Sequence, residues 1–421
     1  MDSQQTLGQM PYSDVDRTLR GLAGSAEGFG GKAIGGLHGA IYRVTSLQDD
    51  GPGSLREACR RSEPLWIVFD VSGTINLSSY IRVSSQKTID GRGQRVVIAG
   101  KGLQLWECRD VILCNLVFDG GRGDETDAIQ IKSGSSNIWV DRCTLADYTD
   151  GLIDITRQST DVTLSRCHFT RHDKTVLIGA DPSHVGDRGV IRVTIHHCFF
   201  DGTRQRHPRV RFGKVHLYDN YTRDWGIYAV CASVEAQIVS QCNVYEAGDK
   251  TKKVFEYKPE KAADRRDTVA GWIVSKGDAF LNGAVPSLVD GPGSVEDVFK
   301  PQDYYQRWTM DPASAALKER LKVIAGWQKV PRPRDWRAAN PIAARASRDV
   351  GVGRASYSSS YKHAGIFPKT KKRKKKHIFK LSLTRVGRLG SSVRGPVLLS
   401  VAGLPGLSVP LTASLGRFDV T

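Results

Sequence analysis

The chain has 421 residues, of which 40% are hydrophobic and 25% are charged, and these fractions are typical of a globular protein rather than a disordered or fibrous one. No apolar run approaches the about 18 residues that a membrane-spanning helix needs, so we expect no membrane span. The segment 1–21 has neither the basic start nor the apolar stretch of a secretory signal, and the sequence therefore predicts no conventional leader there.

The net charge of +17 is concentrated at the C-terminal end of the chain. Residues 361–421 hold 13 Lys and Arg against the single acid Asp419, which leaves a charge of only +5 on residues 1–360. Because residues 1–360 are only mildly basic, they give no reason to expect a nucleic-acid partner. The run Lys369–Lys376 has seven basic residues in eight, and it is either a localisation or polyanion-binding segment or a solvated stretch without a function.

Short segments of alternating apolar and polar residues repeat along the first half of the chain. Each has an apolar residue, a second one two positions later, and a small or apolar residue three positions after that. The third residues of successive segments lie 27, 24, 31, 22 and 22 residues apart. Strands that recur at this period without crossover helices predict an all-β solenoid, namely a parallel β-helix. The segments are Val111-Leu113-Leu116, Ile138-Val140-Cys143, Val162-Leu164-Cys167, Val193-Ile195-Cys198, Val215-Leu217-Asn220 and, more weakly, Val239-Cys242.

The cysteines of this repeat are expected to stack as small buried side chains inside the solenoid, because the chain has eight cysteines and no C-x-x-C pair. After about residue 300 the pattern changes. Asp311 and Pro312 are predicted to begin a short helix that ends at Gly326 and docks on the end of the solenoid. The predicted divisions are an N-terminal segment 1–26, the β-helix 27–300, a helix with an irregular docking segment 301–344, and a basic tail of low order 345–421.

Charged residues at matching offsets in successive repeats are expected on one side of the solenoid. Asp150 and Lys174 each lie seven residues after the cysteine of their repeat, and Arg206 lies eight after its own. Carboxylates that converge without His or Cys favour a hard cation such as Ca²⁺. An ordinary ladder of surface salt bridges is the alternative, and the spacing leaves both open. The acids are Glu125, Asp127, Asp150 and Asp154, and the cations that follow them are Lys174, Arg206 and Arg211.

Several motifs, in the same order, make the chain resemble the pectate lyases of polysaccharide lyase family 1, especially the plant members. The resemblance is clear from about residue 27 to 250 and weaker to about 335. It implies a right-handed parallel β-helix, in agreement with the repeat. The motifs are Gly28–Gly31 (GFGG), Gly35–Tyr42 (GGLHGAIY), Val44–Arg56 (VTSLQDDGPGSLR), Asp127–Ile129 (DAI), Trp139–Arg142 (WVDR), Asp150–Asp154 (DGLID), His172–Gly179 (HDKTVLIG) and Arg206–Gly213 (RHPRVRFG).

The resemblance also implies an activity, which is the Ca²⁺-dependent cleavage of (1,4)-α-D-galacturonan (pectate) by β-elimination to unsaturated oligogalacturonides. In the family, residues matching Asp127, Asp150 and Asp154 hold Ca²⁺, with Glu125 where relatives often have another acid. The residue matching Arg206 abstracts the C5 proton of galacturonate. Those matching Lys174 and Arg211 bind the substrate carboxylate. A guanidinium normally stays protonated, so the role of Arg206 as a base rests on the resemblance alone.

Two other functions compete with this expectation. The first is a catalytically altered pectate-binding protein that keeps the β-helix and its affinity for Ca²⁺ and sugar. The second is a hydrolase, which is disfavoured because it needs paired carboxylates at the point of cleavage, where the late repeats supply Lys and Arg instead. We expect an acidic polysaccharide as partner and a monomer. The family suggests an extracellular or cell-wall location, and the segment 1–21 does not support it.

Overall fold

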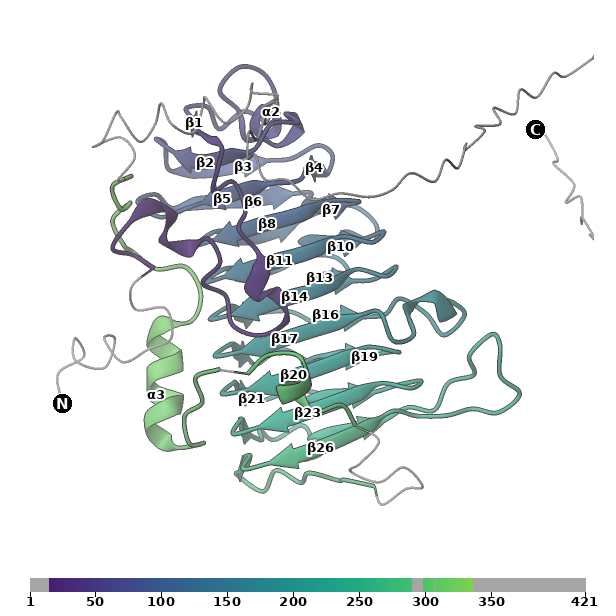
Figure 1. Cartoon of the computed structure of the whole chain (residues 1–421). Helices are drawn as coiled ribbons and strands as arrows, with labels where there is room; N and C mark the ends of the chain where they lie inside the picture. Colours follow the sequence, from purple (N-terminus) through teal and green to yellow (C-terminus); the bar gives the residue numbers. More distant parts are fainter. Residues whose placement is uncertain (1–14, 290–297, 307, 336–421) are drawn as a thin grey trace, which may run out of the picture. The chain divides into compact units, whose positions relative to one another are not determined.

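The chain winds into a solenoid of three parallel β-sheets, and each coil adds one strand to each sheet in turn (Figure 1). The computed structural model describes residues 15–289, 298–306 and 308–335, so the predicted basic tail 345–421 lies outside the described residues. All pairings between named strands are parallel, as the repeat predicted. The prediction of an all-β parallel β-helix is therefore confirmed.

The strands divide among a ten-stranded, a nine-stranded and an eight-stranded sheet. The ten-stranded sheet comprises β1 (Ala40–Val44), β2 (Leu65–Phe69), β5 (Lys87–Asp90), β8 (Arg109–Cys114), β11 (Ser136–Asp141), β14 (Thr160–Ser165), β17 (Arg192–His196), β20 (Lys214–Tyr218), β23 (Gln237–Gln241) and β26 (Trp272–Lys276). The nine-stranded sheet comprises β3 (Gly73–Asn76), β6 (Val96–Gly100), β9 (Val117–Gly121), β12 (Thr144–Ala146), β15 (His168–Thr170), β18 (Phe199–Asp201), β21 (Tyr221–Arg223), β24 (Val244–Glu246) and β27 (Ala279–Leu281). The eight-stranded sheet comprises β4 (Ile81–Val83), β7 (Leu103–Trp106), β10 (Ile129–Lys132), β13 (Gly151–Ile155), β16 (Lys174–Ile178), β19 (Arg209–Val210), β22 (Val230–Ala232) and β25 (Phe255–Tyr257).

The register of the ten-stranded sheet follows the repeat. Val140 of β11 pairs with Leu113 of β8 and with Leu164 of β14. These side chains are fully buried inside the solenoid, where apolar residues of every coil form one continuous core. The cysteines of the repeat are free, fully buried and stacked at the start of the nine-stranded sheet, namely Cys143, Cys167 and Cys198.

The weakest member of the repeat, at Cys242, is out of register by one residue. Leu217 of β20 pairs with Ser240 of β23, and the Asn220 amide donates a hydrogen bond to Asn243 Oδ1 at 2.9 Å. The column of small buried side chains therefore continues from Asn220 to Asn243, and Cys242 lies in the turn before it. The prediction was wrong here because β23 has two adjacent apolar residues, and its pattern fits either register.

A single residue turns the chain from the ten-stranded into the nine-stranded sheet at successive coils. Each such residue has a left-handed φ between 50° and 57°. Each is also linked through its backbone to the next coil, as where His197 N–H donates to Tyr218 O at 3.3 Å. We call this set the corner column, and its members are Asn115, Arg142, Arg166, His197, Asp219 and Cys242.

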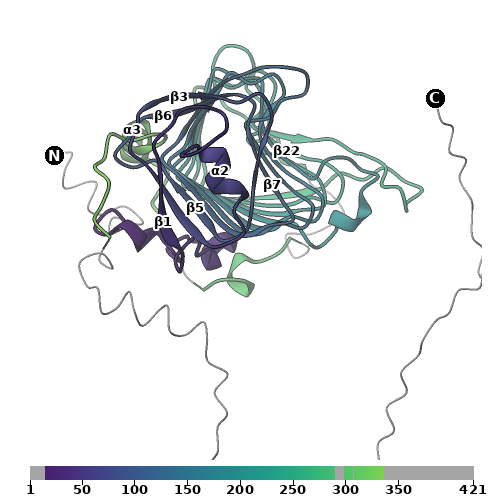
Figure 2. The ribbon, with the colours of Figure 1, turned by 90° about the horizontal axis from the view of Figure 1, so that it is seen from above.

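Two α-helices and four short 3₁₀ helices complete the described structure. They are η1 (Leu19–Leu22), η2 (Phe29–Lys32), α2 (Leu55–Arg60), η3 (Val185–Asp187), η4 (Pro301–Asp303) and α3 (Ala315–Ile324). The sequence analysis missed α2, whose buried Leu55, Ala58 and Cys59 join the core at the first coils (Figures 1 and 2). None of the described helices is long and apolar enough to cross a membrane.

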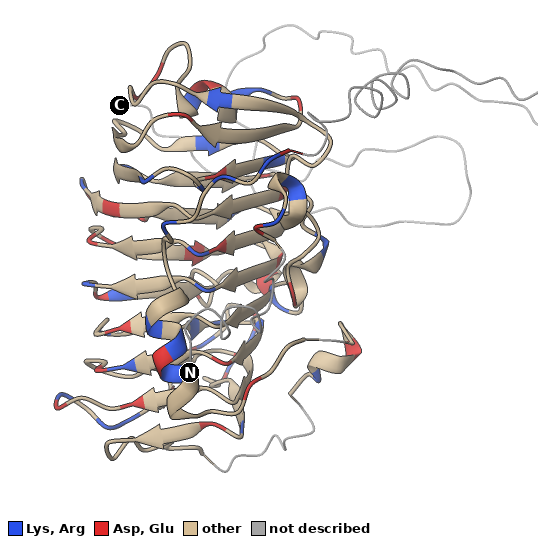
Figure 3. Ribbon diagram, turned by 90° about the vertical axis from the view of Figure 1, so that its left-hand side faces the viewer, with Lys and Arg blue, Asp and Glu red and all other residues tan. Residues whose placement is uncertain are grey.

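The predicted C-terminal helix is present, but its start and position differ from the prediction. Its N-cap is Ser314, whose hydroxyl accepts a hydrogen bond from Leu317 N–H, so α3 begins three residues after Pro312. Its buried face packs on Phe199 and Tyr221 of the nine-stranded sheet. Helix α3 therefore lies on the flank of the solenoid rather than on its end, and both signs of charge are mixed on that flank (Figures 1 and 3).

The described part of the N-terminal segment covers the outer face of the ten-stranded sheet. Leu19 and Leu22 are buried against the outward-facing Trp66 and Trp139. Asp16 accepts hydrogen bonds from the buried guanidinium groups of Arg92 and Arg142. These contacts cover the two Trp side chains. The predicted boundary between the N-terminal segment and the β-helix at residue 26 stays a prediction.

Candidate active site

Three of the four predicted acids surround the first residue of β13. Asp127 precedes β10, Asp150 precedes β13, and Asp154 lies within β13 beside Gln130 of β10. Alternation along β13 directs Ile153 and Ile155 into the core, so Asp154 is on the outer face of the eight-stranded sheet. The spacing of the motif DGLID thus places two carboxylates on one outer surface.

Asp127 is held in place by three groups. Gly151 N–H donates to Asp127 Oδ1 at 2.7 Å, and the Gln130 amide donates to Asp127 Oδ2 at 2.8 Å. The backbone N–H of Asp127 donates to the Tyr80 hydroxyl at 2.8 Å. The side chain is almost completely buried, with 4% of the residue exposed. These bonds fix the carboxylate beside Gly151.

Gly151 leaves room between two of the carboxylates. A Cβ atom at this position would stand 2.8 Å from Asp127 Oδ1 and 2.8 Å from Asp154 Oδ1, closer than real Cβ contacts come. The two oxygens therefore converge on one point in front of a residue that has no side chain.

Burial and crowding of the acids dominate the electrostatics of the cluster. Burial, together with the charges of Asp127 and Asp150, raises the pKa of Asp154 well above its usual range. Burial is also the main cause that raises the pKa of Asp127. Burial and the charges of the same acids raise the pKa of Tyr80 to about 12. A cation placed among these groups would favour their ionised forms.

The predicted cations lie on the following coils. Lys174 at the start of β16 pairs with Gly151 in the sheet, and its Nζ is 2.7 Å from Asp150 Oδ1. Gln205 on the next coil forms a parallel β-bridge with Lys174. Arg206 follows Gln205 directly and therefore lies two coils after Gly151. The charge of Arg206 reaches Asp154 and favours its ionised form. The Nε of Arg206 is buried and has no hydrogen-bond partner among the described residues.

Arg211 is placed differently from the other two cations. Its Nε and Nη2 donate to the two carboxylate oxygens of Glu260 at 2.7 and 2.9 Å, and its Nη1 donates to the carbonyls of Gly179 and Ala180. Only 8% of Arg211 is exposed. The guanidinium is therefore engaged by Glu260, so its predicted contact with substrate stays a prediction.

Glu125, the fourth predicted metal ligand, is in the turn between β9 and β10. It is exposed, with a φ of 44°. No contact between its side chain and the three aspartates is recorded among the described residues. Its role as a ligand therefore also stays a prediction.

The sequence analysis missed the residues that orient the site. Tyr80 and Gln130 position Asp127, and Glu260 binds Arg211. Gln130 could have been found from the repeat, because it is an outward-facing residue of β10 that pairs with Asp154 of β13. Tyr80 and Glu260 are 47 and 49 residues from their partners, and no local pattern links them.

A cavity of about 400 Å³ opens on the Lys174 side of the cluster. Asp150, His172 and Lys174 line it together with Arg171 and Arg204. His172 donates a hydrogen bond from Nε2 to the Asp150 carbonyl at 2.7 Å, as expected of a structural histidine. This cavity therefore presents cations next to the acids.

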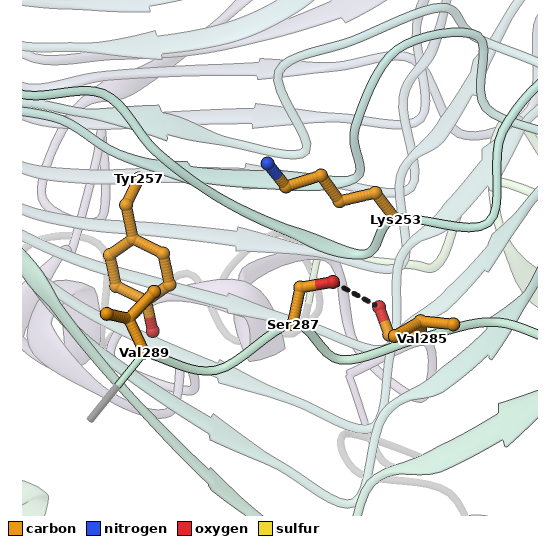
Figure 4. A pocket seen from close by; sticks show the side chains of 5 residues that line it. All are labelled: Lys253, Tyr257, Val285, Ser287 and Val289. Atoms are coloured by element: carbon orange, nitrogen blue, oxygen red, sulfur yellow. Dashed lines mark hydrogen bonds between the residues drawn. The ribbon is translucent and has the colours of Figure 1, made fainter.

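A second cavity, of about 560 Å³, lies at the later coils of the solenoid (Figure 4). Lys253, Tyr257, Val285, Ser287 and Val289 line it, and the Ser287 hydroxyl donates to the Val285 carbonyl. None of the predicted site residues contributes to its lining.

The donor set fits the divalent cation that the sequence predicted. All the atoms that converge at Gly151 are carboxylate oxygens, which Ca²⁺ prefers, and the nearby histidine uses Nε2 to bind a backbone carbonyl. Asp127 is also held by hydrogen bonds from Gly151 and Gln130, as ligating carboxylates usually are.

Comparison with known proteins agrees with the fold. A family model described as pectate lyase matches residues 74–329. Pectate lyase 1 of Ambrosia artemisiifolia is 34% identical over 329 residues, which cover 73% of this chain and 81% of that protein. A pectate lyase of Nicotiana tabacum is 39% identical over 292 residues, covering 62% of this chain and 72% of that protein.

Solved structures share the same solenoid. The crystal structure of jun a 1, the major allergen from cedar pollen, is 30% identical with a TM-score of 0.62, covering 75% of this chain and 96% of that one. A pectate lyase bound to a hexasaccharide has a TM-score of 0.59 at 19% identity, covering 75% and 99%, and supports the fold alone. The fold and the family match define a polysaccharide lyase. The chain belongs to the pectate lyase family.

Proposed function

We propose that the protein cleaves (1,4)-α-D-galacturonan by Ca²⁺-dependent β-elimination. The observation that carries the proposal is the meeting of Asp127 Oδ1 and Asp154 Oδ1 in front of Gly151, one coil before Lys174 and two before Arg206. An acidic polysaccharide suits this arrangement because its carboxylates can bind both a divalent cation and a lysine.

Asp127, Asp150 and Asp154 are the residues that would hold the ion, with Glu125 as a further predicted ligand. A bound Ca²⁺ supplies positive charge that stabilises the negative charge developing on the uronate. Lys174 lies at the edge of the cavity, where its ammonium can bind the substrate carboxylate.

Arg206 is the proposed base. In its neutral, deprotonated form it takes the C5 proton, the electron pair of the C–H bond forms the C4–C5 double bond, and the C4–O bond breaks with its pair going to the leaving oxygen. A proton from solvent completes the leaving hydroxyl. No acid among the described residues binds the Nε–H of Arg206, in contrast to Arg211, so no carboxylate there favours the charged form of its guanidinium through this nitrogen.

One observation favours the alternative of a catalytically altered pectate-binding protein. Both arms of Arg211 are bound by Glu260 and two backbone carbonyls, so this cation is engaged without substrate. In that case the protein would bind polygalacturonate in the presence of Ca²⁺ without turnover.

The experiment measures the ultraviolet absorbance of unsaturated product from polygalacturonate and Ca²⁺ with wild-type protein and two arginine variants. We expect Arg206→Lys to lower kcat at least a hundredfold with little change in substrate affinity, because the charge remains but the guanidine geometry is lost. The matched control is Arg43→Lys on the first coil, whose side chain is 55% exposed and pairs with Asp70, and we expect it to keep most of its activity. Equal activity of Arg206→Lys and wild type would remove Arg206 from the base role.

A further inference from the structure

A second group of possible metal ligands lies in the corner column, away from the eight-stranded sheet that carries the three aspartates. His197 and Asp219 are consecutive members of this column on adjacent coils. Asp311 comes from the segment before α3 and lies against them. The group therefore joins the solenoid to the chain that runs along its flank.

Three ligand atoms of this group face one another. His197 Nε2 is 3.4 Å from Asp219 Oδ2 and 3.7 Å from Asp311 Oδ2. Each of the three residues offers an atom that lies within 4.8 Å of the others. His197 and Asp219 are fully buried, whereas the side chain of Asp311 is 29% exposed, which leaves a route from solvent to the group.

The buried atoms at the centre lack hydrogen-bond partners. His197 Nε2 and Asp219 Oδ1 are buried and have none among the described residues. Separations of 3.4 and 3.7 Å are too long for strong hydrogen bonds. They match the spacing of ligands around a tetrahedral metal, because bonds of about 2.0–2.2 Å place neighbouring ligand atoms about 3.3–3.6 Å apart.

Hydrogen bonds to neighbouring groups also hold the three ligands in place, as outer partners do in metal sites. His197 Nδ1 is 2.9 Å from His196 Nδ1, and a proton donated there from His197 leaves its Nε2 with a free lone pair. Asp311 N–H donates to Asp219 Oδ2 at 2.8 Å, and Arg320 of α3 donates to Asp311 Oδ2 at 2.6 Å. These bonds orient all three ligands toward the same point.

The charge balance also favours a cation. Two carboxylates face the centre, and among the described residues Arg320 is the cation that pairs with them, so with both acids ionised one negative charge has no partner. Burial is the main cause that raises the pKa of Asp219 to about 8, and the charge of Asp311 adds to it. A fully buried acid and a partly exposed one beside an imidazole make a site that a divalent ion would stabilise.

We propose that His197, Asp219 and Asp311 bind a divalent transition-metal ion of the Zn²⁺ class, which fastens the segment leading into α3 to the solenoid. An imidazole among the ligands favours Zn²⁺ over Ca²⁺, in contrast to the all-oxygen cluster at Gly151. The site is structural, since it lies at the corner between the ten- and nine-stranded sheets and not on the face that carries Lys174 and Arg206.

The test uses the full chain, stripped with a chelator and titrated with Zn²⁺ alone in a calorimeter, together with a melting curve. We expect one tight site, and a rise in Tm when Zn²⁺ is present. Asp311→Asn should weaken this binding at least tenfold and abolish the rise. Asp303→Asn, which changes an exposed acid of the same segment, should retain both.

Two further results distinguish this site from the calcium cluster and from adventitious binding. Asp154→Asn should bind Zn²⁺ as the wild type does, because Asp154 belongs to the other cluster. Co²⁺ in place of Zn²⁺ should give visible absorption bands of a four-coordinate ion in the wild type and not in Asp311→Asn. Equal Zn²⁺ affinity in wild type and Asp311→Asn, or no Zn²⁺ binding by the wild type, would overturn the proposal.

Discussion

At the scale of single residues, the site depends on one glycine as much as on the acids. Gly151 pairs in the sheet with Lys174, donates its N–H to Asp127, and leaves open the space toward which Asp127 and Asp154 point. A side chain here would compete with a cation for the same space, while the backbone hydrogen bonds could remain.

Gly151→Ala should therefore weaken Ca²⁺ binding at least tenfold, as should Asp154→Asn, which removes one charge. The added methyl would stand 2.8 Å from both carboxylate oxygens, so one of them has to move. Calorimetric titration with Ca²⁺ measures the effect. Gly213→Ala is the control, since its methyl would meet the Ile178 side chain instead. Unchanged Ca²⁺ affinity in Gly151→Ala would contradict the placement of the ion.

At the scale of elements, segments from both ends of the chain are fastened along the outside of the solenoid. The N-terminal segment is held through Asp16, and α3 is held through an apolar face on the nine-stranded sheet. Each attachment makes a separate prediction about stability.

The ion pairs of Asp16 should make folding sensitive to acid. Burial by itself would raise the pKa of Asp16, but Arg142 and Arg92 lower it from 3.8 to about 2. Because the folded-state pKa is depressed, this contribution is present above about pH 4 and is lost as pH falls toward 2. The side chain is 35% exposed, so solvent screens part of this interaction. We therefore expect the ion pairs of Asp16 to contribute about 1–2 kcal/mol to the free energy of unfolding.

Asp16→Asn should therefore lower the free energy of unfolding at pH 7 by about that amount and flatten its dependence on pH between 4 and 2. Urea denaturation at pH 7 and at pH 3 measures both effects. Asp267→Asn, at an exposed position, should leave the curve unchanged. A variant at Asp16 that matches the wild type at pH 7 would show that this attachment contributes nothing to stability.

The helix α3 should contribute through its buried leucines. Leu321→Ala removes a fully buried side chain from the contact with Phe199 and Tyr221, and we expect a loss of about 2–4 kcal/mol. Val323→Ala on the same helix changes a residue that is 65% exposed, and it should cost less than about 0.5 kcal/mol. Thermal or urea denaturation compares the two. Equal effects would mean that α3 does not pack on the sheet as described.

At the scale of the whole molecule, the strand repeat predicted the architecture because each coil buries the same two side chains inside the solenoid. The pattern at Val140 and Leu164 therefore aligned strands 24 residues apart in their correct register. The same logic failed at Cys242, where adjacent apolar residues allow two registers. It also missed α2, which has no counterpart in the other coils.

From the sequence, only those site residues could be placed together that occupy matching positions in successive repeats. Asp150 and Lys174 lie at matching offsets on adjoining coils, so their ion pair follows from the coil period. Tyr80 and Glu260 come from distant coils and loops, and their contacts with Asp127 and Arg211 arise from tertiary packing. The contact of Asp311 with His197 is of the same kind, since the chain returns along the flank to make it.

The central claim is that the molecule is a lyase, and the chemical identity of its products tests this most directly. Polygalacturonate digested by the purified protein with Ca²⁺ is analysed by mass spectrometry. We predict oligogalacturonides with one unsaturated end, each lighter by one water than the corresponding hydrolysis product, and no products after chelation. Saturated oligogalacturonides as the only products, or intact polymer under conditions where the protein binds it, would contradict the account.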